Sequence, residues 1–106
     1  MTDPWDNLQA TVAAEGCPEF DSWVSKMEWL ALAWSGEVGE VANEVKKIRR
    51  DDGGLTGERS ARVLSELVDA TVYQLVMLDH LGVRFSRLHD LVRAAHEAFL
   101  ARTAVG

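Results

Sequence analysis

One apolar stripe at helical spacing constrains this sequence more than any other feature. Successive side chains on an α-helix are about 100° apart, so residues three or four positions apart share a face. Between residues 21 and 50 one such face collects Trp23, Met27, Leu30, Trp34, Val41, Val45 and Ile48. The sequence nowhere sustains a period-two alternation of apolar and polar residues, so we predict no strands and an all-α fold.

Turn and capping residues divide the chain into four predicted helices. Asp21 and Thr56 are candidate N-caps of the two long helices. The breaks are Gly16 with Pro18, the run Asp51-Asp52-Gly53-Gly54, and Gly82. The predicted helices cover residues 6–14, 21–50, 57–81 and 86–103. A chain of 106 residues suits a single domain, residues 1–106, and we expect a four-helix bundle.

The third predicted helix is apolar almost all round, which is typical of the central helix of a bundle. Its apolar residues are Val63, Leu64, Leu67, Val68, Val72, Leu75, Val76 and Leu78. The second helix adds Trp23, Trp29 and Trp34. Four helices of this length cannot cover so much apolar surface, and uncovered apolar patches usually mark interfaces. We therefore predict a homo-oligomer, a homodimer or homotetramer with a twofold axis, that completes the bundle.

Acidic side chains interrupt these apolar faces. Glu37 and Glu44 fall inside the stripe of the second helix and Glu40 lies on its edge, whereas Glu66 and Asp69 share one face of the third helix. Burying an unpaired carboxylate costs on the order of several kcal/mol, and crowding several together adds repulsion. Arginine partners, protonation or a divalent cation could each compensate that cost.

The spacing of the acids favours a cation. Residues three apart lie on one helical face, so Glu37 with Glu40 and Glu66 with Asp69 each present two carboxylates. Antiparallel packing of the two helices would bring the pairs face to face. Hard cations such as Mg²⁺ prefer oxygen ligands of this kind.

Two stretches of the sequence carry these acids in a longer pattern. Leu32–Lys47 contains Glu37-Val38-Gly39-Glu40-Val41-Ala42, and Ser65–Leu75 contains Glu66-Leu67-Val68-Asp69, with Tyr73 one turn later. This pattern resembles the motifs of MazG-like nucleotide pyrophosphohydrolases, which consist of Glu-x-x-Glu, a spacer and Glu-x-x-Asp on neighbouring helices. The resemblance covers about residues 27 to 81. The sequence departs from the family at Gly36, where relatives often carry another acid.

The resemblance implies an all-α bundle, assembled as dimers or dimers of dimers, that cleaves a nucleoside triphosphate to the monophosphate and pyrophosphate. Mg²⁺, which Mn²⁺ can replace, would be held by Glu37, Glu40, Glu66 and Asp69. A metal-activated water would attack the α-phosphorus. Glu44 would hold a second metal or act as a base toward that water.

Each candidate residue has a structural alternative. The acids could be solvated or paired with Arg59, Arg62 or Lys47. Trp34 could stack on a base or pack in a core or subunit interface. A basic run, Lys46, Lys47, Arg49 and Arg50, could bind phosphate or compensate the negative end of a helix. Of these residues, we expect Lys47 to contact the substrate. Tyr73 could contact the nucleotide or be a buried phenol.

The remaining features narrow the class of protein. His80, His89 and His96 occur in no Glu-x-x-His motif, which argues against a di-iron bundle. Cys17 is the only cysteine; we interpret it as an idle thiol in a reducing compartment.

A formal net charge of −6 argues against binding a nucleic-acid polymer. The sequence shows no signal peptide and no apolar run long enough to span a membrane, so we expect a cytoplasmic protein without a membrane partner. The alternative to an enzyme is a non-catalytic helical interaction module.

Overall fold

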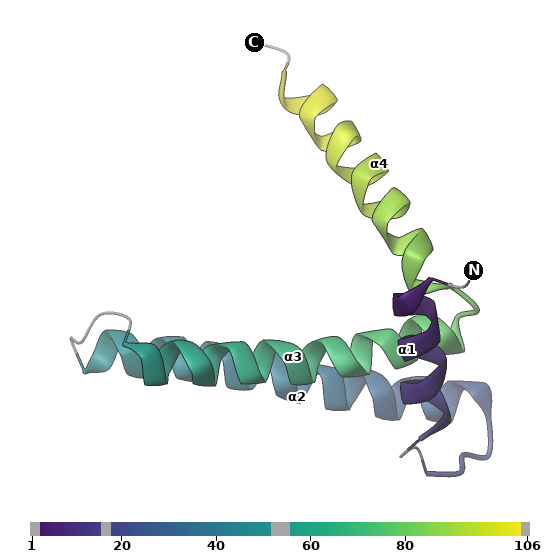
Figure 1. The fold of residues 1–106 in the computed structure, drawn as a ribbon, viewed down its shortest axis with the longest axis horizontal. Coiled ribbons are helices and arrows are strands. Elements are labelled where there is room, and N and C mark those ends of the chain that lie inside the picture. The colour runs from purple at the N-terminus through teal and green to yellow at the C-terminus, as the bar shows by residue number, and fades with distance from the viewer. Residues whose placement is uncertain (1–2, 16–17, 52–55, 105–106) are drawn as a thin grey trace.

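The computed structural model describes residues 3–15, 18–51 and 56–104 (Figure 1). These residues form four helices: α1 (Pro4–Ala14), α2 (Trp23–Arg50), α3 (Gly57–His80) and α4 (Phe85–Thr103). The described ranges contain no strand, so the all-α prediction is confirmed. Every predicted helix is present, and its ends lie within two residues of the predicted ends.

Of the two N-caps predicted for the long helices, one is correct and one is wrong. Thr56 caps α3, because its hydroxyl accepts the backbone N–H of Arg59 at 3.2 Å. Asp21 does not cap α2; Ser22 does, with its hydroxyl accepting the backbone N–H of Ser25 at 3.0 Å. Of the predicted breaks, Gly16 and the run 52–54 lie outside the described residues, as does Cys17.

Gly82 ends α3 as predicted. Its φ of 76° is left-handed, a conformation that glycine adopts without strain. The N–H of Val83 donates to the carbonyl of Leu78 at 2.8 Å, and the N–H of Gly82 donates to the carbonyl of Asp79 at 2.9 Å. This closing pattern satisfies the last carbonyls of α3 and turns the chain toward α4.

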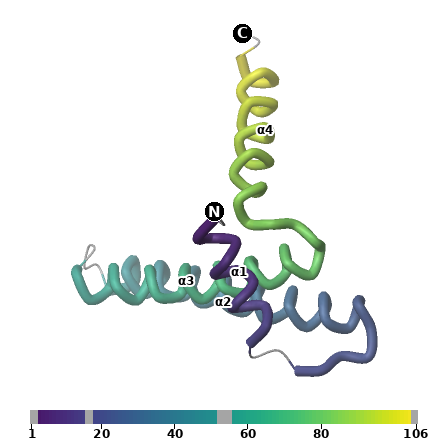
Figure 2. Tube along the Cα trace, turned by 45° about the vertical axis from the view of Figure 1, so that its right-hand side comes forward, coloured from purple at the N-terminus to yellow at the C-terminus, as the bar shows by residue number. Residues whose placement is uncertain are grey.

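The helices α2 and α3 run antiparallel as a long hairpin, and α1 crosses it near the start of α2 and the end of α3 (Figures 1 and 2). Among the described residues, the buried apolar side chains are Leu30, Ala70, Leu75 and Val76. Gln9 of α1 is buried with them. We refer below to the end of the hairpin that α1 crosses as the covered half, and to the rest as the open half.

Polar side chains of α1 fix the turn between α3 and α4. The Gln9 amide donates to the carbonyls of Leu75 (3.2 Å) and Val83 (2.9 Å) and accepts the N–H of Phe85 at 2.8 Å. Asp6 accepts the backbone N–H and the hydroxyl of Ser86 at 2.9 and 2.8 Å, and these bonds lower the pKa of the Asp6 carboxyl. Since the N-cap residue of α4 makes no side-chain cap, Asp6 provides one from another helix.

The helix α4 projects away from the other three (Figures 1 and 2). None of its residues is buried, and the radius of gyration of the chain is 17.2 Å, against about 13 Å for a compact domain of this length. The central place predicted for α3 is confirmed, because α3 packs against each of the other helices. A single chain nevertheless does not close a four-helix bundle. Within the described residues, no helix combines the length and apolar character needed to cross a membrane.

Candidate metal centre

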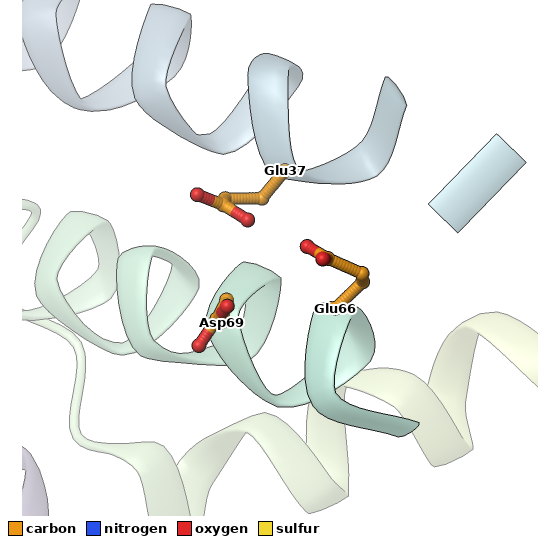
Figure 3. Close-up of side chains that lie close together, drawn as sticks. All are labelled: Glu37, Glu66 and Asp69. Atoms are coloured by element: carbon orange, nitrogen blue, oxygen red, sulfur yellow. The ribbon is translucent and has the colours of Figure 1, made fainter. Parts of the chain in front are cut away.

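Three carboxylates meet between α2 and α3. Glu37 points from α2 toward Glu66 and Asp69 of α3 (Figure 3), and one carboxylate oxygen from each lies within 4.8 Å of the others. Glu37 and Glu66 are half-buried, whereas Asp69 is exposed. The antiparallel hairpin therefore brings the two acidic motifs together, as their spacing predicts. We call Glu37, Glu66 and Asp69 the carboxylate cluster.

The cluster concentrates uncompensated negative charge on Glu66. Partial burial raises the pKa of the Glu66 carboxyl, and the hydrogen bond shared with Glu37 raises it further. The charges of Glu37, Asp69 and Glu40 act in the same direction. Each of these causes disfavours the ionised form, so the cluster is an arrangement that a cation would relieve.

The basic residues that could have neutralised the cluster are engaged elsewhere. Arg59 pairs with Asp51 at 2.8 Å, Arg62 with Glu58 at 2.8 Å, and Lys47 with Glu44 at 3.2 Å. No ion pair among the described side chains involves a member of the cluster. Within the described residues, the salt-bridge alternative is therefore wrong for the three acids of the cluster, whereas Glu44 does pair with Lys47. The alternative of solvated charge stays open, since Asp69 is exposed.

The donor set of the cluster fits a hard divalent cation. All three ligands are carboxylate oxygens, which suit Mg²⁺ and Mn²⁺. Two oxygens bound to one Mg²⁺ at about 2.1 Å are at most about 4.2 Å apart. The observed separations, all within 4.8 Å, need only a small side-chain rotation to reach that limit.

The other acids expected at the site lie further away. Glu40 is one turn beyond Glu37 on α2 and exposed; its charge reaches Glu66, but its carboxylate is outside the cluster. Glu44 lies about 10 Å along the helix axis from Glu37 and pairs with Lys47. Lys47 itself lies about 15 Å along that axis. The structure thus places neither Glu44 nor Lys47 at the cluster.

An aromatic pocket lies further along the hairpin, on the side of α1, and none of the three cluster residues lines it. It has a volume of about 190 Å³ and is lined by Val12, Glu15, Trp29, Leu30, Val72, Tyr73 and Val76. Tyr73, one turn after Asp69 on α3, meets the Trp29 ring edge to face with centroids 6.0 Å apart. Tyr73 therefore lies where a molecule bound at the cluster could reach it, about 6 Å along the helix from Asp69.

Trp29 rather than Trp34 lines this pocket. The two side chains are equally exposed, at 36%, but Trp34 contributes nothing to the pocket wall. The apolar stripe of α2 excludes Trp29, because that residue lies about 100° round the helix from Leu30. Only the crossing of α1 makes a second side of α2 part of a cavity, and the α2 sequence carries no signal for that crossing.

The cluster contains none of the three histidines, all of which lie in described residues. His80 stacks on Trp23, with ring centroids 4.7 Å apart, and its Nε2 lies 2.9 Å from the Trp23 carbonyl oxygen. The Trp23 indole N–H donates in return to the His80 carbonyl at 3.0 Å. His89 lies beside Asp90, and His96 is exposed on α4.

The fold and the cluster define an all-helical protein with a carboxylate centre between two antiparallel helices. The chain is 35% identical over 77 residues to the Gene 37 protein of Mycobacterium phage L5, an alignment that covers 72% of this chain and 67% of that protein. The chain belongs to the family of that phage protein. No protein-family model matches the chain, and no solved structure matches it.

Proposed function

We propose that this protein hydrolyses a nucleoside triphosphate to the monophosphate and pyrophosphate with Mg²⁺, as MazG-like nucleotide pyrophosphohydrolases do. The observation that carries the proposal is the carboxylate cluster, which brings Glu37, Glu66 and Asp69 together without a described cationic partner. The resemblance of the two acidic motifs supplies the reaction class. The phage relative, whose name states no activity, adds nothing to that choice.

In this proposal the cluster is the metal site, and Glu40 joins it from the next turn of α2. The bound metal would supply an activated water and offset charge on the phosphate oxygens. Asp69 and Glu66 hold fixed positions because both project from one α3 face, and Glu37 meets them from α2. The role suggested for Glu44, a second metal ligand or base, would require release of its ion pair with Lys47.

The aromatic pocket is the proposed site of the nucleobase. Trp29 and Tyr73 offer ring surfaces against which a base can pack. Asp69 and Tyr73 are about 6 Å apart along the axis of α3. This distance is comparable to the one that a ribose spans between a base and its α-phosphate. Trp29 thus replaces Trp34 as the proposed aromatic contact, and the phosphate contact expected of Lys47 has no support within one chain.

The assay is incubation of the full chain with a panel of common and modified nucleoside triphosphates and Mg²⁺, with pyrophosphate as the measured product. We expect pyrophosphate from at least one substrate and none in chelator. Asp69→Asn should lower turnover by at least about 100-fold, since loss of an outer-shell partner alone lowers metal-site activity by about 10–100-fold. The matched control is Glu58→Gln, an exposed acid on the same helix that pairs with Arg62.

Two outcomes would contradict the proposal. Release of orthophosphate in place of pyrophosphate would exclude cleavage between the α and β phosphates. No turnover of any triphosphate, together with no effect of Mg²⁺ on the protein, would favour the non-catalytic interaction module.

A further inference from the structure

One charged residue lines the aromatic pocket. Glu15 follows the last residue of α1 and lies at the pocket with Val12, Trp29 and Tyr73. The other lining residues are apolar or aromatic. At about 190 Å³ the pocket is smaller than the roughly 300–1,000 Å³ of a pocket that encloses a drug-sized ligand. It therefore suits one part of a ligand, such as a base, and Glu15 is the charged residue available to distinguish one base from another.

Glu15 occupies a position that the local structure does not favour. It is the C-cap of α1, where the negative end of the helix dipole disfavours a carboxylate. Its backbone N–H donates to the carbonyl of Val12 at 3.2 Å, which fixes the residue at the helix end. The last turn of α1 holds no basic residue, and no ion pair among the described residues involves Glu15. An acid that breaks a local rule without a compensating contact is expected where a protein meets a ligand.

The position of the carboxylate cluster fixes which edge of a base would face α1. Asp69 lies one turn before Tyr73 on α3, whereas Val76, which also lines the pocket, lies in the opposite direction. Phosphates held at the cluster would therefore draw the sugar toward Asp69. The base would pack against Trp29 and Tyr73 with its far edge toward the side that α1 closes, where Glu15 lies.

The chemistry of a carboxylate selects among the edges of the common bases. An ionised carboxylate accepts hydrogen bonds and donates none. Guanine carries two neighbouring donors, N1–H and the N2 amino group, on the edge that faces away from its sugar, so each carboxylate oxygen can accept one. Adenine and cytosine place an acceptor nitrogen beside the amino group, and uracil and thymine place carbonyl oxygens on both sides of N3–H. Those acceptors would face a carboxylate oxygen, so only guanine makes the paired, charge-assisted contact.

We propose that Glu15 reads the N1–H and N2 amino group of guanine, and that guanine nucleoside triphosphates are the preferred substrates. This inference rests on the proposed function, because it takes the aromatic pocket as the base site. Trp29 and Tyr73 hold the ring of any base, whereas Glu15 determines specificity. The negative end of α1 acts in the same direction, because it favours a ligand edge that carries donors.

The first experiment measures binding without turnover. The full chain is titrated in chelator with GMP, IMP and AMP, and the indole N–H of Trp29 is followed by NMR. IMP lacks the N2 amino group, and AMP also has an acceptor in place of N1–H. We expect GMP to bind about 10-fold more tightly than IMP and about 100-fold more tightly than AMP, because one and then both hydrogen bonds to a charged group are lost. Equal affinities for GMP and AMP, or no binding of GMP, would overturn the inference.

Pyrophosphate release from GTP and ATP with Mg²⁺ separates this inference from the proposed function. Preferential binding of GMP without pyrophosphate release from GTP would contradict the proposed function alone. Release from GTP and ATP with equal kcat/KM would contradict the guanine assignment alone.

The second experiment repeats the titrations with Glu15→Gln, which keeps the size of the side chain but replaces one acceptor oxygen by a donor group. We expect the preference for GMP over AMP to fall below about 10-fold, with AMP binding not weakened. The melting temperature should not fall, because the variant removes a negative charge from the negative end of α1. The control is Glu28→Gln, an exposed acid next to Trp29 that does not line the pocket and should keep the preference. Equal weakening of GMP and AMP binding by Glu15→Gln would indicate a structural role and overturn the inference.

Discussion

The covered and open halves of the α2–α3 hairpin satisfy their side chains very differently. In the covered half Leu30, Leu75 and Val76 are buried, and Gln9 finds a partner for both ends of its amide. In the open half, the carboxylates of Glu37 and Glu66 lie close together, and Leu64 is exposed to solvent. Complete packing and hydrogen bonding are what a stabilising region requires. Residues that break those rules mark where a protein meets something outside its own chain.

The largest effect on stability is expected from a matched pair of leucines on α2. Leu30 is 0% exposed and Leu32 is 75% exposed. Leu30→Ala should lower the free energy of unfolding by about 2–5 kcal/mol, because a buried cavity forms. Leu32→Ala should change it by no more than about 0.5 kcal/mol. Urea unfolding of both variants measures the difference, and equal losses would show that the covered half is not the stabilising core.

A smaller loss is expected at Gln9. Gln9→Leu strands the N–H of Phe85 and the carbonyl of Val83, so we expect a loss of about 1–3 kcal/mol. Hydrogen exchange at the Phe85 amide should also accelerate, because that N–H loses its acceptor. Gln74→Leu, a half-buried amide on α3, serves as the control. Unchanged exchange at Phe85 would mean that Gln9 does not hold the start of α4.

The pH dependence of the metal-free protein should reveal the strain in the open half. Glu66 has a folded-state pKa above its ordinary value of 4.5, so the folded state binds its proton more tightly than the unfolded state does. This group therefore stabilises the fold below pH 4.5, and that stabilisation is lost as pH rises through the raised pKa. Asp51, whose pKa is lowered by Arg50 and Arg59, stays ionised throughout this range and does not mask the effect.

The measurement is the melting temperature in chelator from pH 7 to pH 5, for the parent and Glu66→Gln. The variant lacks the titrating group, so the parent should gain stability relative to the variant as pH falls. Relative loss by the parent would mean that Glu66 has a cationic partner.

Much of this architecture follows from local rules in the sequence. Helix periodicity, Thr56 and Gly82 predict the elements because capping and left-handed turns are properties of a few neighbouring residues. The meeting of Glu37 with Glu66 and Asp69 follows from spacing and antiparallel packing. The cap at Ser22 rather than Asp21 shows that two adjacent cap residues compete on geometry that sequence does not specify.

The features of the site and fold that the sequence could not predict depend mostly on where α1 and α4 lie. Glu44 lies in the same stripe of α2 as Glu37, and Lys47 lies in the last turn of that helix. They pair with each other there, away from the cluster. Trp29 lines the pocket because α1 crosses beside it. The direction of α4 depends on Gln9 and Asp6, residues far from it in sequence. The contacts of α1 with the pocket and with the start of α4 are long-range, and no single amphipathic pattern encodes them.

The central claim, that the carboxylate cluster holds a metal ion, is tested most directly by thermal melting with and without Mg²⁺. A ligand that binds only the folded state stabilises it by mass action, so Mg²⁺ should raise the melting temperature of the parent and of Glu58→Gln. Glu66→Gln should respond much less and, in chelator, should be at least as stable as the parent, because it removes repulsion. An unresponsive parent, together with a Glu66→Gln variant that is strongly destabilised in chelator, would contradict the claim.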